Sequence, residues 1–336
     1  MLNCRAVALL VATMVPAPAC ASDIDPGSVN SAGFAELAPD GLIHPQIVKA
    51  QILLDRANMS PGEIDGKSSG KLHETLRAFA EARGLPANLG WGPDLWSKLA
   101  ASSPEPVLTE YVVTREDARG PFVQLPPKIE DRKGLKTLGY GSLREALAEK
   151  FHMSEELLAV LNPGNSFAAA GEKVVVANVR TNGKPATAAH LDVDKDRQTV
   201  RAYSSGGELI GFFPASVGSN DKPTPSGTLK VTLIESDPSY HYNPKFRFRE
   251  VDTQKPFDLG PGPNNPLGTM WIALSKPSYG IHGTPEPSLV GKSESHGCVR
   301  LTNWDAQRLA AMLSKGVAVN FIGRQPDRPD VVFAAY

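Results

Sequence analysis

The chain has 336 residues, which is enough for two or three domains that each bury a hydrophobic core. Its 35 lysines and arginines almost balance its 36 aspartates and glutamates, so the net charge gives no support for nucleic-acid binding. The 30 glycines and 29 prolines exceed average usage, which favours turns and β-structure over a helical bundle.

The first segment of the chain, residues 1–21, follows the pattern of a secretory signal peptide. Arg5 supplies the positive charge, and the apolar stretch 6–15 is too short to span a bilayer. Small residues flank Cys20, so we expect cleavage after Ala21 and export to the periplasm or cell wall. The alternative is a lipoprotein in which Cys20 is acylated.

Residues 22–44 are small, polar and rich in turn formers, and they predict a linker. Residues 45–100 then predict a small all-α module of three helices, with a tight turn at 60–66. This module resembles the peptidoglycan-binding module of secreted wall enzymes, most specifically in the Pro-Gly-x-Ile-Asp-Gly run that begins at Pro61. The resemblance implies peptidoglycan binding, and the alternative is an ordinary helical packing domain.

Residues 108–180 predict a small α+β module in the order strand, helix, helix, strand. The strands are expected at 111–114 and 173–176, and Ser154 is expected to cap the second helix. This order resembles a lysin-motif module, which binds glycan chains. The connection over 114–143 is far longer than that motif usually has.

Residues 188–323 change to a period of two and predict a mostly antiparallel β domain, followed by a tail at 324–336. One clear helix is expected from Thr302, ending at a Gly316 C-cap. The predicted fold is therefore multidomain, with an all-α module, an α+β module and a mostly antiparallel β domain. Within that domain, strands are expected at 191–193, 199–203, 209–217, 228–234, 269–274 and 317–322.

Cys298 is the one cysteine that follows the predicted signal peptide, and it lies in a Ser-His-Gly-Cys-Val-Arg-Leu run at 295–301. A single cysteine in an exported protein cannot form an internal disulfide, and neighbouring histidine and arginine stabilise a thiolate. His282, at the end of an expected strand, could act as the base, with His296 as the alternative. Arg300 could bind a carboxylate, and Gly297 permits close approach of a substrate.

These runs together resemble the catalytic signature of the L,D-transpeptidase family, and the similarity extends over roughly 188–322. A His-Gly-Thr run at 282–284 precedes the cysteine run, and Pro-Thr-Pro-Ser-Gly-Thr at 223–228 and Asn-Pro-Leu-Gly at 265–268 also fit. The resemblance implies that Cys298 is the nucleophile and His282 its base. It implies that the backbone carbonyl of Gly283 orients the imidazole, so that Gly283→Ala should be a mild change. The implied substrate and oxyanion pocket is formed by Ser295, His296, Gly297 and Arg300.

The resemblance also implies a reaction and its partners. The cysteine would attack a peptidoglycan tetrapeptide stem, release D-alanine and form a thioester. An amine from a second stem would then complete a 3→3 crosslink, and a lipoprotein lysine or a free D-amino acid are other acceptors. No cofactor or metal is expected. We expect a monomer that contacts stem peptides and glycan.

Three other functions fit the same residues. Water as the acceptor would make the protein an L,D-carboxypeptidase or endopeptidase, because both reactions share the acyl-enzyme. A protein with an inactive site would bind cell wall without catalysis. A zinc hydrolase would use His282, His296 and Cys298 as metal ligands.

Overall fold

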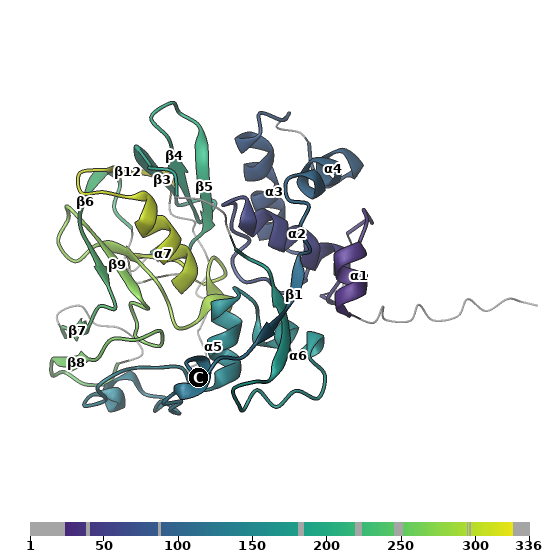
Figure 1. Cartoon of the computed structure of the whole chain (residues 1–336). Helices are drawn as coiled ribbons and strands as arrows, with labels where there is room; N and C mark the ends of the chain where they lie inside the picture. The colour runs from purple at the N-terminus through teal and green to yellow at the C-terminus, as the bar shows by residue number, and fades with distance from the viewer. Residues whose placement is uncertain are drawn as a thin grey trace, which may run out of the picture.

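Two hydrophobic cores organise the chain in the computed structural model (Figure 1). The structure describes residues 24–37, 41–86, 89–180, 185–218, 224–244, 251–293, 295 and 297–324. The predicted signal peptide lies outside these residues. Within the described part of the chain, no helix combines the length and apolar character needed to cross a membrane.

The first core lies among the helices and the two-stranded sheet of the amino-terminal half. The strands β1 and β2 pair antiparallel, so the two ends of the predicted lysin-motif-like module lie side by side. The elements of this half are α1 (Pro26–Ser31), α2 (Pro45–Arg56), α3 (Gly70–Ala82), α4 (Pro93–Ala101), β1 (Leu108–Val112), the short turns η1 (Asp117–Arg119) and η2 (Ile129–Arg132), α5 (Leu143–Lys150), α6 (Glu155–Leu161) and β2 (Lys173–Ala177).

Serine hydroxyls cap the amino ends of several of these helices. The side chains of Ser69, Ser142 and Ser154 accept backbone N–H groups in the first turns of α3, α5 and α6, at 3.2, 3.0 and 3.0 Å. Each cap satisfies one of the N–H groups that a helix start leaves without a partner. The expected cap at Ser154 is confirmed.

The predicted linker over 22–44 contains a helix, α1. Asp25 caps it, and Pro26 occupies its first turn. Val29 is fully buried against the first core, which explains why so short a helix is retained. The segment therefore packs against the helices that follow it.

The helical module and the middle module share one apolar core. The turn at 60–66 joins them, because Ile64 donates to the His152 carbonyl at 2.8 Å and accepts from the Ser154 N–H at 2.9 Å. The run that resembles a peptidoglycan-binding motif is thus largely buried in an intramolecular contact. Core side chains come from both modules, including Leu53, Leu76, Leu147, Leu158 and Val176.

The second core lies inside an eight-stranded sheet of order β11-β10-β9-β6-β12-β3-β4-β5. The pairs β10–β11 and β12–β3 are parallel and the others are antiparallel, so the predicted mostly antiparallel domain is confirmed. The elements are β3 (His190–Asp194), β4 (Thr199–Tyr203), β5 (Leu209–Pro214), β6 (Gly227–Ser236), β7 (Tyr240–Tyr242), β8 (Phe257–Leu259), β9 (Met270–Leu274), β10 (Gly280–His282), the short turn η3 (Pro287–Leu289), β11 (Val299–Arg300), α7 (Asn303–Met312) and β12 (Ala318–Ile322).

The sheet curls until its two ends meet. Beyond β5 the chain continues to Ser216, which exchanges backbone hydrogen bonds of 2.9 Å with Arg300 of β11. Gly218 forms a further bridge with Ser295. The backbones of Ser295 and Arg300, on either side of Cys298, are therefore both bonded to the chain that follows β5.

The helix α7 is shorter than predicted. It ends at Met312, because Leu313 takes an extended conformation, so Gly316 lies in the turn before β12 and does not cap the helix. Thr302 is the N-cap, as expected, and accepts from the N–H of Asp305 at 3.2 Å.

The helical module covers the open edge of β5. The N–H of Ser60 donates to the Phe212 carbonyl at 2.8 Å, and the N–H of Phe212 donates to the Asn58 carbonyl at 3.0 Å. Phe212 belongs to the first core and its neighbour Phe213 to the second, because alternate residues of a strand face opposite sides. One strand thus contributes to both cores, which joins the two halves of the chain.

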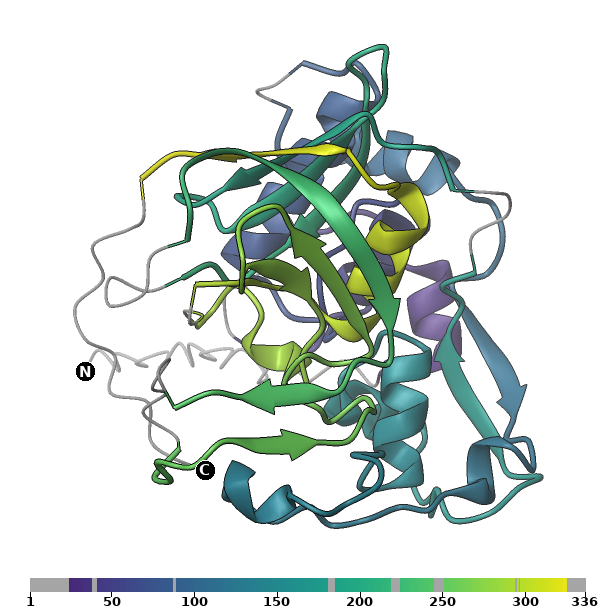
Figure 2. The same ribbon diagram turned by 90° about the vertical axis from the view of Figure 1, so that its left-hand side faces the viewer.

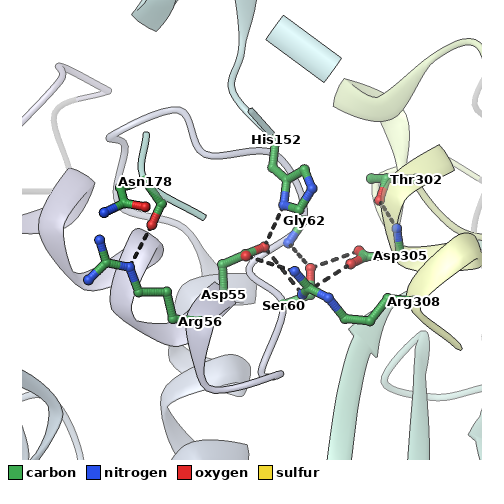
Figure 3. Close-up of polar contacts among 9 residues, drawn as sticks. All are labelled: Asp55, Arg56, Ser60, Gly62, His152, Asn178, Thr302, Asp305 and Arg308. Carbon is green, nitrogen blue, oxygen red and sulfur yellow. Dashed lines mark hydrogen bonds and ion pairs between the residues drawn. The ribbon is translucent and has the colours of Figure 1, made fainter. Parts of the chain in front are cut away.

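Polar side chains complete this junction along α7 (Figure 3). Asp55 of α2 lies between His152 and Arg308, at 3.0 and 2.8 Å, and Ser60 donates to Asp305 at 2.7 Å. The ring of His152 also stacks on Trp304, with centroids 5.1 Å apart. The predicted modules are therefore docked on the β domain through buried contacts.

The long connection over 114–143 lies beside the β7–β8 hairpin in both views (Figures 1 and 2). Leu138 donates its N–H to the Pro261 carbonyl at 2.8 Å and accepts from the N–H of Asn264 at 2.9 Å. Lys128 pairs with Asp252 at 3.0 Å on the surface. The insertion in the middle module thus packs on the β domain.

Candidate active site

A short parallel pair of strands contains two of the predicted site residues, His282 and Arg300. His282 is in register with Arg300, and Ile281 with Val299. Ile281 and Val299 are buried in the second core, so the side chains of His282 and Arg300 face the opposite side of the sheet. Cys298 directly precedes β11, one residue before Val299, which is in register with Ile281.

The imidazole of His282 is held by a backbone contact. Its Nδ1 lies 2.6 Å from the carbonyl oxygen of Gly283, which can only accept, so Nδ1 carries the proton and Nε2 has the free lone pair. Burial, reinforced by the positive charge of Arg300, lowers the pKa of His282 to about 3, and the Gly283 hydrogen bond offsets part of this shift. The ring is therefore neutral at ordinary pH and can accept a proton at Nε2.

Cys298 is half-buried and lies at the end of a tight loop. Its Sγ is 3.6 Å from the carbonyl oxygen of Ser278, in the turn between β9 and β10. The hydroxyl of Ser295 bonds to the Cys298 carbonyl and accepts the N–H of Gly297 at 3.3 Å. Gly297 has φ +102°, a conformation that favours glycine. Ser295 is buried, so its hydroxyl supports the loop from within.

The amino end of α7 does not lie directly behind Cys298. The strand β11 and two further residues separate Cys298 from Asn303, the first residue of the helix. The residues directly after the cysteine therefore form a strand before the helix begins at its expected cap, Thr302. His296, the alternative base, lies outside the described residues.

Trp271 is a site residue that the sequence patterns did not reveal. It lies on β9 in register with His282, and the two rings are 5.8 Å apart. Its indole covers Gly280, where a Cβ would come within 2.4 Å of the ring. Trp271 thus forms a wall beside His282. The alternation of buried and half-buried residues in 270–274 is the signal that could have placed it on this face.

Asn303 is a second such residue. Its Oδ1 accepts the N–H of Thr269 at 3.1 Å and lies against the backbones of Gly268 and Gly283. A Cβ would stand 2.2 Å from this oxygen at Gly283 and 1.9 Å from it at Gly268. Because such distances are far below van der Waals contact, neither glycine has room for alanine, and the mild effect expected for Gly283→Ala does not follow.

Among the described residues, no group of three or more histidine, cysteine, aspartate or glutamate side chains is arranged to hold a metal ion. The three ligands of the zinc hypothesis cannot be compared as a set, because His296 is outside those residues.

Comparisons with known proteins agree with this arrangement of strands and motifs. Residues 188–321 match the YkuD family model, described as the L,D-transpeptidase catalytic domain. The chain is 30% identical over 183 residues to the putative L,D-transpeptidase YkuD of Bacillus licheniformis, covering 54% of this chain and 93% of that protein. It is 34% identical over 140 residues to a putative L,D-transpeptidase of Fuscovulum blasticum, covering 42% and 70%.

Among solved structures, an L,D-transpeptidase from Mycobacterium smegmatis is similar at 21% identity and a TM-score of 0.33, covering 46% of this chain and 65% of that one. The relatives in Bacillus and Fuscovulum are matched over most of their length. The chain therefore belongs to the L,D-transpeptidase family, with its catalytic domain at residues 188–321.

Proposed function

We propose that this protein is a peptidoglycan L,D-transpeptidase that forms 3→3 crosslinks through a thioester on Cys298. The observation that carries the proposal is the β10–β11 register, which pairs His282 with Arg300, two residues after Cys298. Membership of the L,D-transpeptidase family supports the same reaction class. The cysteine and its neighbours are the residues with which such chemistry is normally performed.

The first half of the proposed reaction makes the acyl-enzyme. Nε2 of His282 takes the proton of the Cys298 thiol, and the sulfur attacks the carbonyl of the third residue of a tetrapeptide stem. The C–N bond to the terminal D-alanine breaks, and the leaving amine takes the proton from His282. A thioester and free D-alanine result.

The second half regenerates the enzyme. A side-chain amine of a second stem attacks the thioester, and the C–S bond breaks as the new amide forms. A proton lost by the amine returns to the sulfur by way of His282. One amide is made for each amide broken, so the proposed reaction needs no ATP and no cofactor.

Substrate recognition would use the residues around the sulfur. Arg300 can hold the free carboxylate of the terminal D-alanine, because its planar guanidinium suits a carboxylate in two-point contact. Ser295, His296 and Gly297 would shape the pocket for the oxyanion. Trp271 would add an apolar wall beside His282.

The proposed place of action is the periplasm or cell wall. Export by a signal peptide over 1–21 would bring the protein to peptidoglycan in the periplasm or wall. The amino-terminal modules would hold it near glycan and raise the local substrate concentration. We propose that the protein is a monomer. We also propose that the amine of a lipoprotein lysine can replace the second stem as the acceptor.

The test is incubation with purified disaccharide tetrapeptide, followed by mass spectrometry of the products and assay of D-alanine. We expect D-alanine and a dimer whose fragmentation shows a link between the third residues of both stems. Cys298→Ala should abolish both products, and His282→Ala should nearly do so. Arg300→Lys should reduce turnover, because a point charge replaces a planar fork.

Other outcomes distinguish the alternatives. Tripeptide without dimer at any acceptor concentration would assign the protein as an L,D-carboxypeptidase. A dimer joined through the fourth residue would contradict the L,D assignment. A lack of all products, with peptidoglycan still bound, would leave a binding protein.

A further inference from the structure

Glu149, near the end of α5, is a buried carboxylate from the middle module that reaches the β domain. Its side chain accepts hydrogen bonds from Nδ2 of Asn303, 3.0 Å from each carboxylate oxygen, and from the hydroxyl of Tyr140 at 3.2 Å. Burial raises the pKa of Glu149 to about 7, although these hydrogen bonds offset part of the shift. A carboxyl group, which is costly to bury away from water, therefore lies at the interface between the middle module and the β domain.

The side-chain amide of Asn303 also bonds to backbone groups of the β domain. Its Nδ2 also donates to the Pro263 carbonyl at 3.2 Å, while its Oδ1 accepts from the N–H of Thr269 at 3.1 Å. These partners fix which atom of the amide faces which way, because the carboxylate and the carbonyl can only accept. Among the described residues, Glu149 is thus one of three partners that fix the orientation of the Asn303 side chain, and the only one that comes from the middle module.

The amide of Asn303 packs against the peptide that orients the base. Its Oδ1 occupies the space where a Gly283 side chain would be, and its Cα is 3.3 Å from that position. The carbonyl of Gly283 in turn lies 2.6 Å from Nδ1 of His282. A continuous set of contacts therefore runs from Glu149 through Asn303 and Gly283 to His282.

We propose that Glu149 is a positioning residue of the active site, which holds Asn303 against the Gly283 peptide and so fixes the His282 ring beside Cys298. Glu149 acts through Asn303 and Gly283, since its side chain bonds to Asn303 and Tyr140 and reaches the ring only through them. The middle module is then part of the catalytic apparatus and does more than tether the enzyme. This inference rests on the proposed roles of His282 and Cys298.

The experiment measures the rate of Cys298 alkylation by iodoacetamide in the full chain, from pH 5 to pH 9, by intact mass. Glu149→Met removes the acceptor while keeping about the length of the side chain, and Nδ2 of Asn303 keeps the Pro263 carbonyl as an acceptor. Alkylation at pH 7 should slow by roughly 3- to 10-fold, the range expected for one lost supporting hydrogen bond. The midpoint of the pH profile should move upward, because a misplaced imidazole takes the proton of the Cys298 thiol less readily.

Two further variants make the result specific. Glu149→Gln keeps one oxygen for Asn303 and should shift the midpoint in the same direction by less. Ser60→Ala is the matched control, because it removes the hydrogen bond to Asp305 at the same interface without touching Asn303. It should lower the melting temperature and leave the midpoint unchanged.

The proposal is overturned if Glu149→Met and Glu149→Gln lose stability as Ser60→Ala does but keep the wild-type pH profile. Alkylation needs no peptidoglycan, so this result is separate from the fate of the proposed function. A wild-type enzyme that releases no D-alanine, but whose alkylation responds to Glu149→Met and to His282→Ala, would contradict the transpeptidase reaction and still support the positioning role.

Discussion

Asp55 of α2 accepts a hydrogen bond from the guanidinium of Arg308 in α7 at 2.8 Å, across 253 positions of the sequence. Both side chains are almost completely enclosed (Figure 3). Burial alone would raise the pKa of Asp55, but the charge of Arg308 and the contact with His152 hold it well below its usual range. The helix that follows the cysteine motif is therefore fixed to the first helices of the protein by a buried ion pair.

Arg308→Met should strongly destabilise the protein, because it leaves Asp55 charged and buried without its main partner. We expect a loss of about 3–5 kcal/mol in the free energy of unfolding, measured by urea denaturation. The double variant Asp55→Asn with Arg308→Met should recover part of this loss. Arg144→Ala, which breaks an exposed pair with Glu155, is the control and should cost less than about 1 kcal/mol. Equal effects of Arg308→Met and Arg144→Ala would contradict a buried junction.

The stability of this junction should also depend on pH through Glu149. Its pKa is about 7 in the folded protein, above the ordinary value of 4.5, so the folded state binds more protons than the unfolded state between these values. Stability from this group is therefore fully present below pH 4.5 and is lost as pH rises through 7, by up to about 3 kcal/mol. Asp305, whose pKa burial raises to about 6, acts in the same direction.

His282 opposes this trend, so the test compares two proteins. Its folded pKa of about 3 lies below the ordinary 6.5, and its contribution therefore grows as pH rises through that window. Unfolding free energies of the wild type and of Glu149→Gln should be measured from pH 4 to pH 8. The difference should favour Glu149→Gln progressively as pH rises. A difference in unfolding free energy that stays constant with pH would mean that the pKa of Glu149 is not raised in the folded protein.

Some of this architecture could be predicted from local patterns. The apolar spacing of 45–100 predicted α2, α3 and α4, and alternation predicted β3, β4 and β9, because these elements are long enough to show a period. A strand that ends at His282 was expected and is β10, whereas β11 was beyond such reasoning, because two residues carry no period.

The residues that support the site could not be predicted either, and the reason is a different one. Cys298 and His282 were found from their residue types and neighbouring motif. Trp271, Asn303 and Glu149 act through contacts between distant parts of the chain, and an ordinary tryptophan, asparagine or glutamate on a strand or helix carries no local signal of such contacts. The docking of the modules was hidden in the same way, since the changes of pattern along the chain indicated separate modules and gave no signal of the contacts between them.

Gly283→Ala should be severe. A Cβ at this position would come 2.2 Å from Oδ1 of Asn303, so either the amide or the peptide must move, and the carbonyl that orients His282 moves with it. We expect a destabilisation of about 1–3 kcal/mol together with loss of D-alanine release. Adding Asn303→Ala should restore only part of the stability, because it removes the clash but also the amide that donates to Glu149. If Gly283→Ala keeps wild-type activity, the close packing of Asn303 on Gly283 is wrong.

A carbapenem should acylate Cys298, because its strained β-lactam carbonyl presents the same electrophile as the scissile amide. The thiol would add across the C–N bond of the ring, so nothing leaves and the protein mass should rise by the full mass of the drug. Ordinary penicillins should react poorly. Intact mass spectrometry of the wild type and of Cys298→Ala decides the site, since only the wild type should change. His282→Ala should slow the reaction, because the sulfur then lacks its base. An equal mass shift in Cys298→Ala, or none in the wild type, would contradict the role of Cys298 as the acyl-accepting nucleophile.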